Sequence, residues 1–154
     1  MENNTIIALK NISVEFDGEK VLDDLNLSIR DGEFVTLLGS SGCGKTTTLR
    51  LIAGFLEPDS GEVFFDGKSM NGVPPYKREV NTIFQRYALF PHYNVYENIA
   101  YGLRVRKVPE KQIREQVTEM LRLVNLQGFE KRNVSRLSGG QQQRVAIARA
   151  LVLK

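Results

Sequence analysis

An eight-residue segment containing three glycines, residues 39–46, constrains this sequence more than any other part of it. It reads Gly-Ser-Ser-Gly-Cys-Gly-Lys-Thr and fits the spacing G-x-x-x-x-G-K-[ST] of a phosphate-binding loop. The apolar run 34–38 before it predicts a buried strand, and residues 46–53 after it predict a helix that ends at Gly54. Glycines let backbone N–H groups converge on an anion, and the following helix directs its positive end to the same place. The segment therefore predicts a layered α/β domain that binds a phosphorylated ligand.

Each residue type in this loop has a role with a nucleotide. We expect the backbone from Gly39 to Gly44 to surround the phosphates, which involves Gly39, Ser40, Ser41, Gly42, Cys43 and Gly44. Lys45 would reach the β- and γ-phosphates, and Thr46 would offer its hydroxyl to Mg²⁺. The loop alone leaves GTPases, kinases and ATPases open as functional classes.

The remaining pattern predicts a sheet followed by a small helical region. Alternating side chains over 6–16 and 21–29 indicate two antiparallel strands joined by the turn 17–20. Residues 62–65 predict a short strand, and the apolar segment 80–84 predicts a buried strand that ends at Gln85. Beyond it, helical spacing is found around 95–103 and from Pro109 onward, so we expect a helical subdomain inserted into the α/β core.

Composition excludes several classes of protein. The chain has 154 residues, a net charge of +3 and a single cysteine, so one domain without an internal disulfide is expected. The charge excess is too small and too scattered to indicate nucleic-acid binding. No apolar run approaches the roughly 20 residues that a membrane span needs, and the N-terminus does not resemble a signal peptide. We therefore expect a cytoplasmic protein.

A second glycine-containing motif, Leu-Ser-Gly-Gly-Gln-Gln-Gln-Arg, occupies residues 137–144. Ser138 followed three residues later by Gln141 is a capping-box pattern, so a helix is expected to start at the serine. Gly139 and Gly140 would each weaken this helix by roughly 1 kcal/mol relative to alanine. Glycines in this place are justified if the backbone must approach a ligand, which predicts a second anion site.

The two motifs, in this order and with a glutamine that ends a strand between them, resemble the ATP-binding-cassette (ABC) ATPases. The resemblance runs from about Ile6 to the end of the chain. The sequence of residues 39–54 and 81–92 is most similar to that of the ATPase subunits of bacterial spermidine/putrescine importers, with sugar-importer ATPases as near neighbours. It implies a P-loop NTPase core with an N-terminal antiparallel β-subdomain and an inserted helical subdomain, incomplete at the C-terminus. The implied limits are 1–85 for the β-subdomain and P-loop core, 86–135 for the helical subdomain and 136–154 for the signature motif and its helix.

The resemblance also assigns roles to individual positions. Phe16 stands where an aromatic residue, usually tyrosine, stacks on adenine, and Thr47 adds a phosphate contact. Gln85 is implied as a catalytic residue beside Mg²⁺ and the attacking water, together with Lys45. The signature residues would bind the γ-phosphate held by a second protomer of a head-to-tail dimer; they are Ser138, Gly139, Gly140 and Gln141.

The same resemblance implies partners and a limit on activity. We expect ATP and Mg²⁺ as cofactors, transmembrane permease subunits and a solute-binding protein as partners, and a position on the inner face of the cell membrane. The family's apolar strand ending in Asp-Glu and its switch histidine follow the signature helix, and the sequence ends at Lys154 before them. We therefore expect this chain to bind nucleotide but to hydrolyse it poorly or not at all by itself. The alternatives are a soluble ABC-type ATPase of translation or DNA repair, a sugar-type importer ATPase, and a nucleotide-binding module without catalysis.

Overall fold

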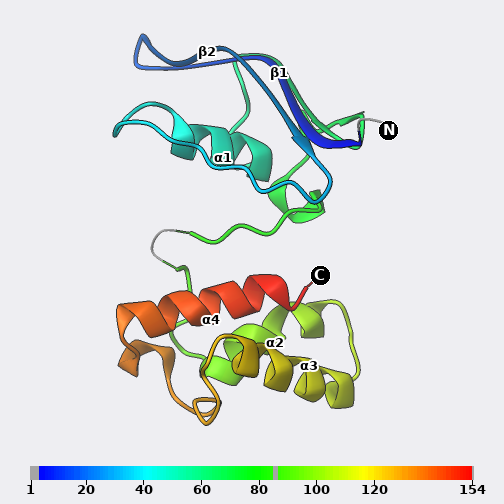
Figure 1. The fold of residues 1–154 in the computed structure, drawn as a ribbon, viewed down its shortest axis with the longest axis vertical. Coiled ribbons are helices and arrows are strands. Elements are labelled where there is room, and N and C mark those ends of the chain that lie inside the picture. The colour runs from blue at the N-terminus through cyan, green and yellow to red at the C-terminus, as the bar shows by residue number, and fades with distance from the viewer. Residues whose placement is uncertain (1–3, 85–86, 154) are drawn as a thin grey trace. The chain divides into compact units, whose positions relative to one another are not determined.

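The computed structural model describes residues 4–84 and 87–153, in two compact units that divide between Val80 and Asn81. Figure 1 shows the strands and helix α1 in the first unit and helices α2, α3 and α4 in the second. Each unit has its own hydrophobic core, so each is described by itself.

The first unit is built on a four-stranded antiparallel sheet in the order β2-β1-β3-β4. Its strands are β1 (Thr5–Phe16), β2 (Glu19–Arg30), β3 (Ser60–Phe65) and the two-residue β4 (Lys68–Ser69). Strands β1 and β2 form a hairpin in which Phe16 pairs with Glu19, and β1 pairs on its other side with β3. The predicted hairpin and the predicted short strand are thus confirmed, with limits that differ by one or two residues.

One face of this sheet packs against helix α1 (Lys45–Ala53), the predicted helix after the loop. The buried side chains of this core are Leu9, Ile12, Val14, Leu22, Leu51, Ile52, Val63 and Phe65. The helix ends as predicted at Gly54, which has a left-handed φ of 78°. A short 3₁₀ helix, η1 (Pro75–Lys77), follows β4.

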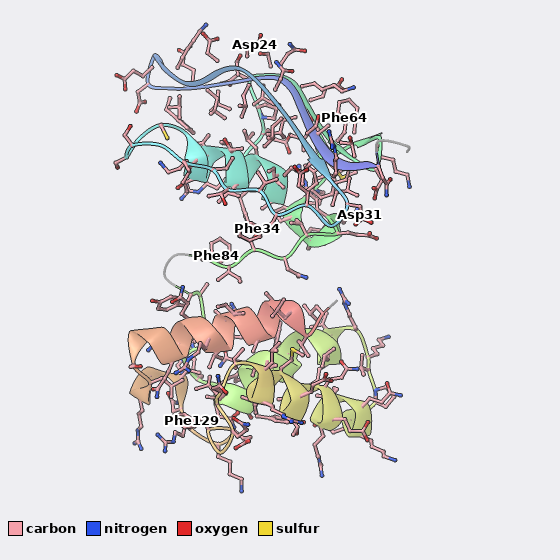
Figure 2. The ribbon with its side chains drawn as sticks, viewed as in Figure 1. Asp24, Asp31, Phe34, Phe64, Phe84 and Phe129 are labelled. Carbon is pink, nitrogen blue, oxygen red and sulfur yellow. The ribbon has the colours of Figure 1, made fainter. Side chains whose placement is uncertain are left out.

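The predicted buried strands 34–38 and 80–84 are wrong: both segments are irregular in the structure. Phe34 is 93% exposed and Leu38 is 86% exposed, and Figure 2 labels Phe34 on this segment. An apolar run becomes a strand only when a neighbour satisfies its backbone N–H and C=O groups. Among the described residues no strand of the sheet pairs with either segment, so their apolar character is not expressed as β-structure.

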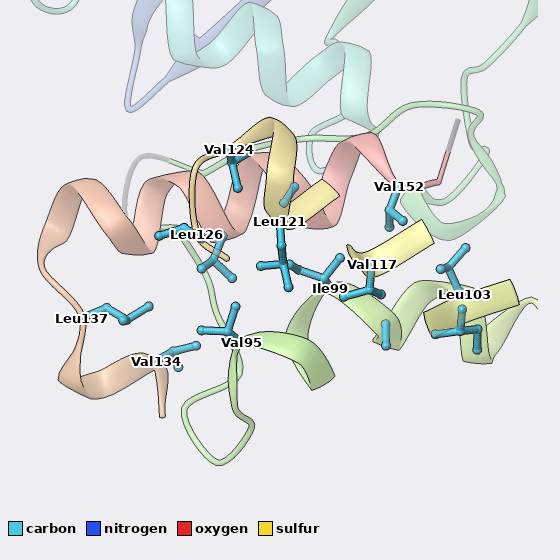
Figure 3. Close-up of a cluster of buried hydrophobic side chains, with 14 residues drawn as sticks. Val95, Ile99, Leu103, Val117, Leu121, Val124, Leu126, Val134, Leu137 and Val152 are labelled. Carbon is cyan, nitrogen blue, oxygen red and sulfur yellow. The ribbon is translucent and has the colours of Figure 1, made fainter. Parts of the chain in front are cut away.

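The second unit is a helical assembly of α2 (Val95–Val105), α3 (Glu110–Leu123), the 3₁₀ helix η2 (Val134–Arg136) and α4 (Gly139–Leu151). All three predicted helices are confirmed, and Ser138 is the N-cap of α4. Figure 3 shows apolar side chains of these elements pointing toward one another. The buried set is Val95, Ile99, Ala100, Leu103, Ile113, Val117, Leu121, Val124, Leu126, Val134, Leu137, Val145, Ala148 and Val152. The signature helix α4 therefore shares one core with α2 and α3, while the domain limits that the resemblance implies remain predictions.

Candidate functional site: a phosphate loop and a signature helix

The loop from Gly39 to Gly44 leads directly into α1, and its glycines are required by its own geometry. Gly44, the N-cap residue, has a φ of 86°, which side-chain-bearing residues rarely adopt. A Cβ atom on Gly44 would lie 2.5 Å from Leu22 Cδ2 and 3.1 Å from the Val21 carbonyl oxygen at the start of β2. The loop is thus packed against the end of the β1–β2 hairpin, and the same end carries Phe16.

Lys45 lies over the loop rather than extending into solvent. Its Nζ donates to the carbonyl oxygens of Gly39 at 2.8 Å and Ser40 at 2.6 Å, and to Cys43 Sγ at 3.1 Å. The hydrogen bond from Lys45 lowers the pKa of the Cys43 thiol, although desolvation acts in the opposite direction. The lysine charge is therefore held at the loop by weak carbonyl acceptors that a phosphate could replace.

The first turn of α1 presents backbone donors to the same loop. No side chain among the described residues caps this helix, and its first turn contains no acidic residue. Thr46 is exposed, Thr47 is half-buried and Thr48 is buried. The uncapped N–H groups, the helix dipole and the ammonium of Lys45 together form a site suited to an anion.

Two residues that the sequence did not single out stabilise this arrangement. Thr48 Oγ1 donates to the Gly44 carbonyl oxygen at 3.0 Å, so it fixes the N-cap residue. Arg78 lies at the opposite end of α1, where it is only 6% exposed and donates to the carbonyl oxygens of Leu51 and Ile52. Burial lowers the pKa of its guanidinium, and Glu57 opposes that effect. The contact of Thr48 with Gly44 joins residues four positions apart in a helix, so it could have been predicted from the sequence. The partners of Arg78 lie too far away in the chain for such a prediction.

Phe16 is 44% exposed at the end of β1. The adenine contact at this position remains a prediction. Gln85, predicted to act in catalysis and at Mg²⁺, lies outside the described residues.

The signature segment begins α4 and is closed by reciprocal hydrogen bonds. Ser138 Oγ accepts from the Gln141 N–H at 3.3 Å, and Gln141 Oε1 accepts from the Ser138 N–H at 3.0 Å. Gly139 and Gly140 occupy the first turn and are exposed. Within the described ranges 4–84 and 87–153, a Cβ atom on Gly140 would have nothing within 4 Å, so this glycine is not needed for packing.

The predicted residues are thus distributed over both units. The structure brings Gly39–Thr47 together with the hairpin end in the first unit, and Ser138–Gln141 together at one helix N-terminus in the second. In the described part of the chain, no group of three or more His, Cys, Asp or Glu side chains could hold a metal ion. None of the described helices is long and apolar enough to cross a membrane.

Comparison with known proteins places these features in a family. The family model described as ABC transporter matches residues 22–154. The chain is 62% identical, over all of its length, to the spermidine/putrescine import ATP-binding protein PotA of Clostridium acetobutylicum, and 56% identical to that of Mesoplasma florum. It covers 44% of each of these relatives, so it spans less than half of their length.

Solved structures show the same fold. The dimeric structure of a bacterial ABC transporter cassette has a TM-score of 0.85 and 34% identity, over 96% of this chain and 69% of that one. The cbiO1 structure from Clostridium perfringens, part of an ABC transporter complex, has a TM-score of 0.81 and 30% identity, over 97% of this chain and 62% of that one. The predicted α/β P-loop fold and the predicted resemblance are confirmed. The chain belongs to the ABC transporter family of ATP-binding proteins.

Proposed function

We propose that this chain binds the phosphates of ATP at residues 39–47. The observation that carries the proposal is the pairing of an uncapped α1 N-terminus with the Lys45 ammonium, which the Gly39 and Ser40 carbonyls hold above the loop. Phosphate oxygens are stronger acceptors than carbonyls, and charge-assisted hydrogen bonds are roughly twice as strong as neutral ones. Lys45 would therefore exchange its carbonyl partners for the β- and γ-phosphates without leaving the loop, while Phe16 would stack on the adenine.

The donor set also fits a magnesium ion that arrives with the nucleotide. Mg²⁺ usually keeps several waters and takes phosphate oxygens plus one or two protein oxygens. The exposed hydroxyl of Thr46 at the start of α1 supplies one such oxygen. Gln85 remains the proposed second residue at the metal and at the attacking water. When bound, Mg²⁺ would neutralise charge on the phosphates.

The signature residues 138–141 would contact the nucleotide of a second protomer. Two exposed glycines and a serine hydroxyl at a helix N-terminus are suited to an anion, and none of the atoms that the structure describes lies within 4 Å of a Cβ atom placed on Gly140. The bacterial ABC cassette to which this chain is 34% identical is dimeric in its solved structure, which supports a dimer here. A head-to-tail dimer of the complete ATPase would place such a motif opposite each phosphate loop.

We further propose that the complete protein powers polyamine import through a membrane permease. The PotA relatives are import ATP-binding proteins for spermidine and putrescine, which supports this assignment over a soluble ABC-type ATPase or a sugar importer. The proposal includes permease subunits, a solute-binding protein and a position on the cytoplasmic face of the membrane.

The experiment that tests the proposal compares two lysine substitutions. Lys45→Ala removes the ammonium at the loop, whereas Lys111→Ala removes an exposed lysine of α3 in the other unit. Because hydrogen bonds to charged groups contribute about 1.5–3 kcal/mol, Lys45→Ala should weaken ATP binding by roughly 10- to 100-fold. Calorimetric titration with Mg-ATP should find unchanged affinity in the Lys111 variant. Equal affinity in both variants would contradict the proposed site.

A further inference from the structure

The segment 87–90, which joins the region around Gln85 to α2, is held by an arginine of the signature helix. Arg149 on α4 donates from Nη1 to the Ala88 carbonyl oxygen at 2.9 Å and from Nη2 to the Tyr87 carbonyl oxygen at 3.1 Å. Its guanidinium also lies 5.2 Å from the centre of the Phe90 ring. One side chain of α4 thus contacts three residues that precede it by about sixty positions.

The two residues whose carbonyls Arg149 binds both have a left-handed backbone. Tyr87 has a φ of 60° and Ala88 a φ of 46°. Consecutive left-handed residues that carry a Cβ atom are disfavoured and persist only where the surroundings hold them. The planar fork of an arginine is suited to two adjacent acceptors, whereas a lysine presents a single ammonium. Arg149 therefore stabilises this particular conformation of the segment.

The segment is also fixed at both of its ends. A Cβ atom on Gly139 would lie 3.7 Å from the Tyr87 hydroxyl oxygen, so the Tyr87 side chain reaches the first turn of α4. Asn98 of α2 is fully buried; its Oδ1 accepts from the Phe90 N–H at 2.9 Å, and its Nδ2 donates to the Phe90 and Asn94 carbonyl oxygens. Segment 87–90 consequently contacts both the signature glycine and the arginine ten residues further along the same helix.

We propose that Arg149 is a positioning residue that fastens segment 87–90 to α4, so that the two move as one body. A helix is a rigid element, and a displacement of the segment would therefore shift the Ser138–Gln141 motif at the N-terminus of α4. Phe90, Tyr93 and Tyr101 form an aromatic cluster with ring centres 4.6–6.2 Å apart, and Tyr93 and Tyr101 are exposed. If a permease contacts this cluster, a step that rests on the proposed function, Arg149 would transmit the contact to the nucleotide of the other protomer.

Amide hydrogen exchange on the whole chain tests whether Arg149 holds segment 87–90 on α4. Three hydrogen-bonded amides report on the segment. The Tyr87 N–H donates to the Phe84 carbonyl oxygen, the Phe90 N–H donates to Asn98 Oδ1, and the Tyr93 N–H donates to the Phe90 carbonyl oxygen. Arg149→Gln should accelerate their exchange by at least about tenfold, because two charge-assisted hydrogen bonds are lost. Arg106→Gln is the matched control: Arg106 donates to the Leu153 carbonyl oxygen at 2.6 Å, near the other end of α4, and its loss should leave these amides unchanged.

Two further variants separate positioning from general stability. Arg149→Lys should give an intermediate rate, and Ala88→Gly in the Arg149→Gln background should restore part of the protection, because glycine adopts the left-handed conformation without strain. Equal acceleration across α3, or no acceleration at 87–93, would overturn the proposal. If Arg149→Gln does not fold, two other variants test the proposal. Arg149→Lys should accelerate the exchange of the same three amides, and the single Ala88→Gly substitution should slow it slightly.

The assembled importer separates this inference from the proposed function. Arg149→Gln should leave ATP affinity unchanged within roughly twofold, and should lower permease-stimulated turnover by about 5- to 150-fold, the usual range of coupling between sites. Absence of ATP binding in the unsubstituted protein would refute the proposed function and leave the exchange result standing. Normal stimulation in the Arg149→Gln importer, together with altered exchange, would refute the transmission step.

Discussion

Helices α1 and α4 both begin beside glycines, yet the two N-termini are closed in different ways. At α1 the N-cap is Gly44, and none of the described side chains caps the first turn. At α4 the N-cap is Ser138, and a capping box with Gln141 satisfies two backbone donors. The first N-terminus has free donors and a lysine already in place. At the second, the capping box already uses the Ser138 and Gln141 N–H groups, and the Ser138 hydroxyl, which only accepts in that box, can still donate to a ligand.

Gly44 at α1 and Gly140 at α4 also differ in how strictly the fold requires a glycine. Gly44 has a left-handed backbone and no room for a Cβ atom, so the fold of this chain requires it. Gly140 does not have a positive φ, and space around it is open among residues 4–84 and 87–153. Open space at Gly140 leaves room for a partner's nucleotide at α4, as proposed above.

The largest expected effect comes from substituting Gly44 by alanine. Gly44→Ala forces a left-handed alanine, at about 1–2 kcal/mol, and overpacks the contact with Val21 and Leu22, at about 1–3 kcal/mol. We expect the free energy of unfolding of the first unit to fall by roughly 3 kcal/mol and ATP binding to be lost, as measured by NMR-monitored urea unfolding and by calorimetry.

Gly140→Ala is the matched substitution in the second unit. It should stabilise α4 by up to about 1 kcal/mol, because alanine is the better helix former, and it should leave ATP affinity at the loop unchanged. A destabilising effect of Gly140→Ala would show that this glycine is required by the fold after all, and the contrast between the two helices would disappear.

The next effect concerns the capping box of α4. Ser138→Ala removes the hydroxyl that accepts from the Gln141 N–H and should lower the stability of the second unit by about 1 kcal/mol. Tyrosine fluorescence during urea unfolding suits this measurement, because four of the five tyrosines lie in residues 81–154. Ser138→Thr keeps a hydroxyl and serves as the control. If Ser138→Ala proved neutral, the capping box would contribute nothing measurable to the stability of α4.

Local rules predict these helix ends from the sequence, whereas long-range contacts escape such rules. Gly54 as the end of α1 and Ser138 as the start of α4 follow from residues within one turn. The predicted strands 34–38 and 80–84 are wrong because an apolar run does not reveal whether a pairing strand is present. The hydrogen bonds of Arg78 to Leu51 and of Arg149 to Tyr87 join residues 27 and 62 positions apart, and neither pair forms a local motif.

The smallest expected effect is a change in the reactivity of the Cys43 thiol. This reactivity reports on Lys45, a residue at the start of α1 that has no counterpart at the start of α4. The hydrogen bond from Lys45 holds the Cys43 pKa below the ordinary value of a thiol, so more thiolate is present at a given pH. The pH midpoint of N-ethylmaleimide alkylation should therefore lie below that of a free cysteine and rise in Lys45→Ala. Mg-ATP should slow alkylation, since it would cover the loop and draw Lys45 away from the sulfur.

The Cys43→Ala variant is the control for these alkylation measurements. The thiol is exposed and accepts a hydrogen bond from Lys45 that a phosphate would replace, so we expect ATP affinity to be retained. Binding in this variant should become insensitive to N-ethylmaleimide, because the reagent acts by its bulk inside the loop. Continued sensitivity would mean that alkylation blocks binding elsewhere. An unshifted pH midpoint in Lys45→Ala would mean that the lysine is not held at the loop before the nucleotide arrives, and α1 would then be no better prepared for a phosphate than α4.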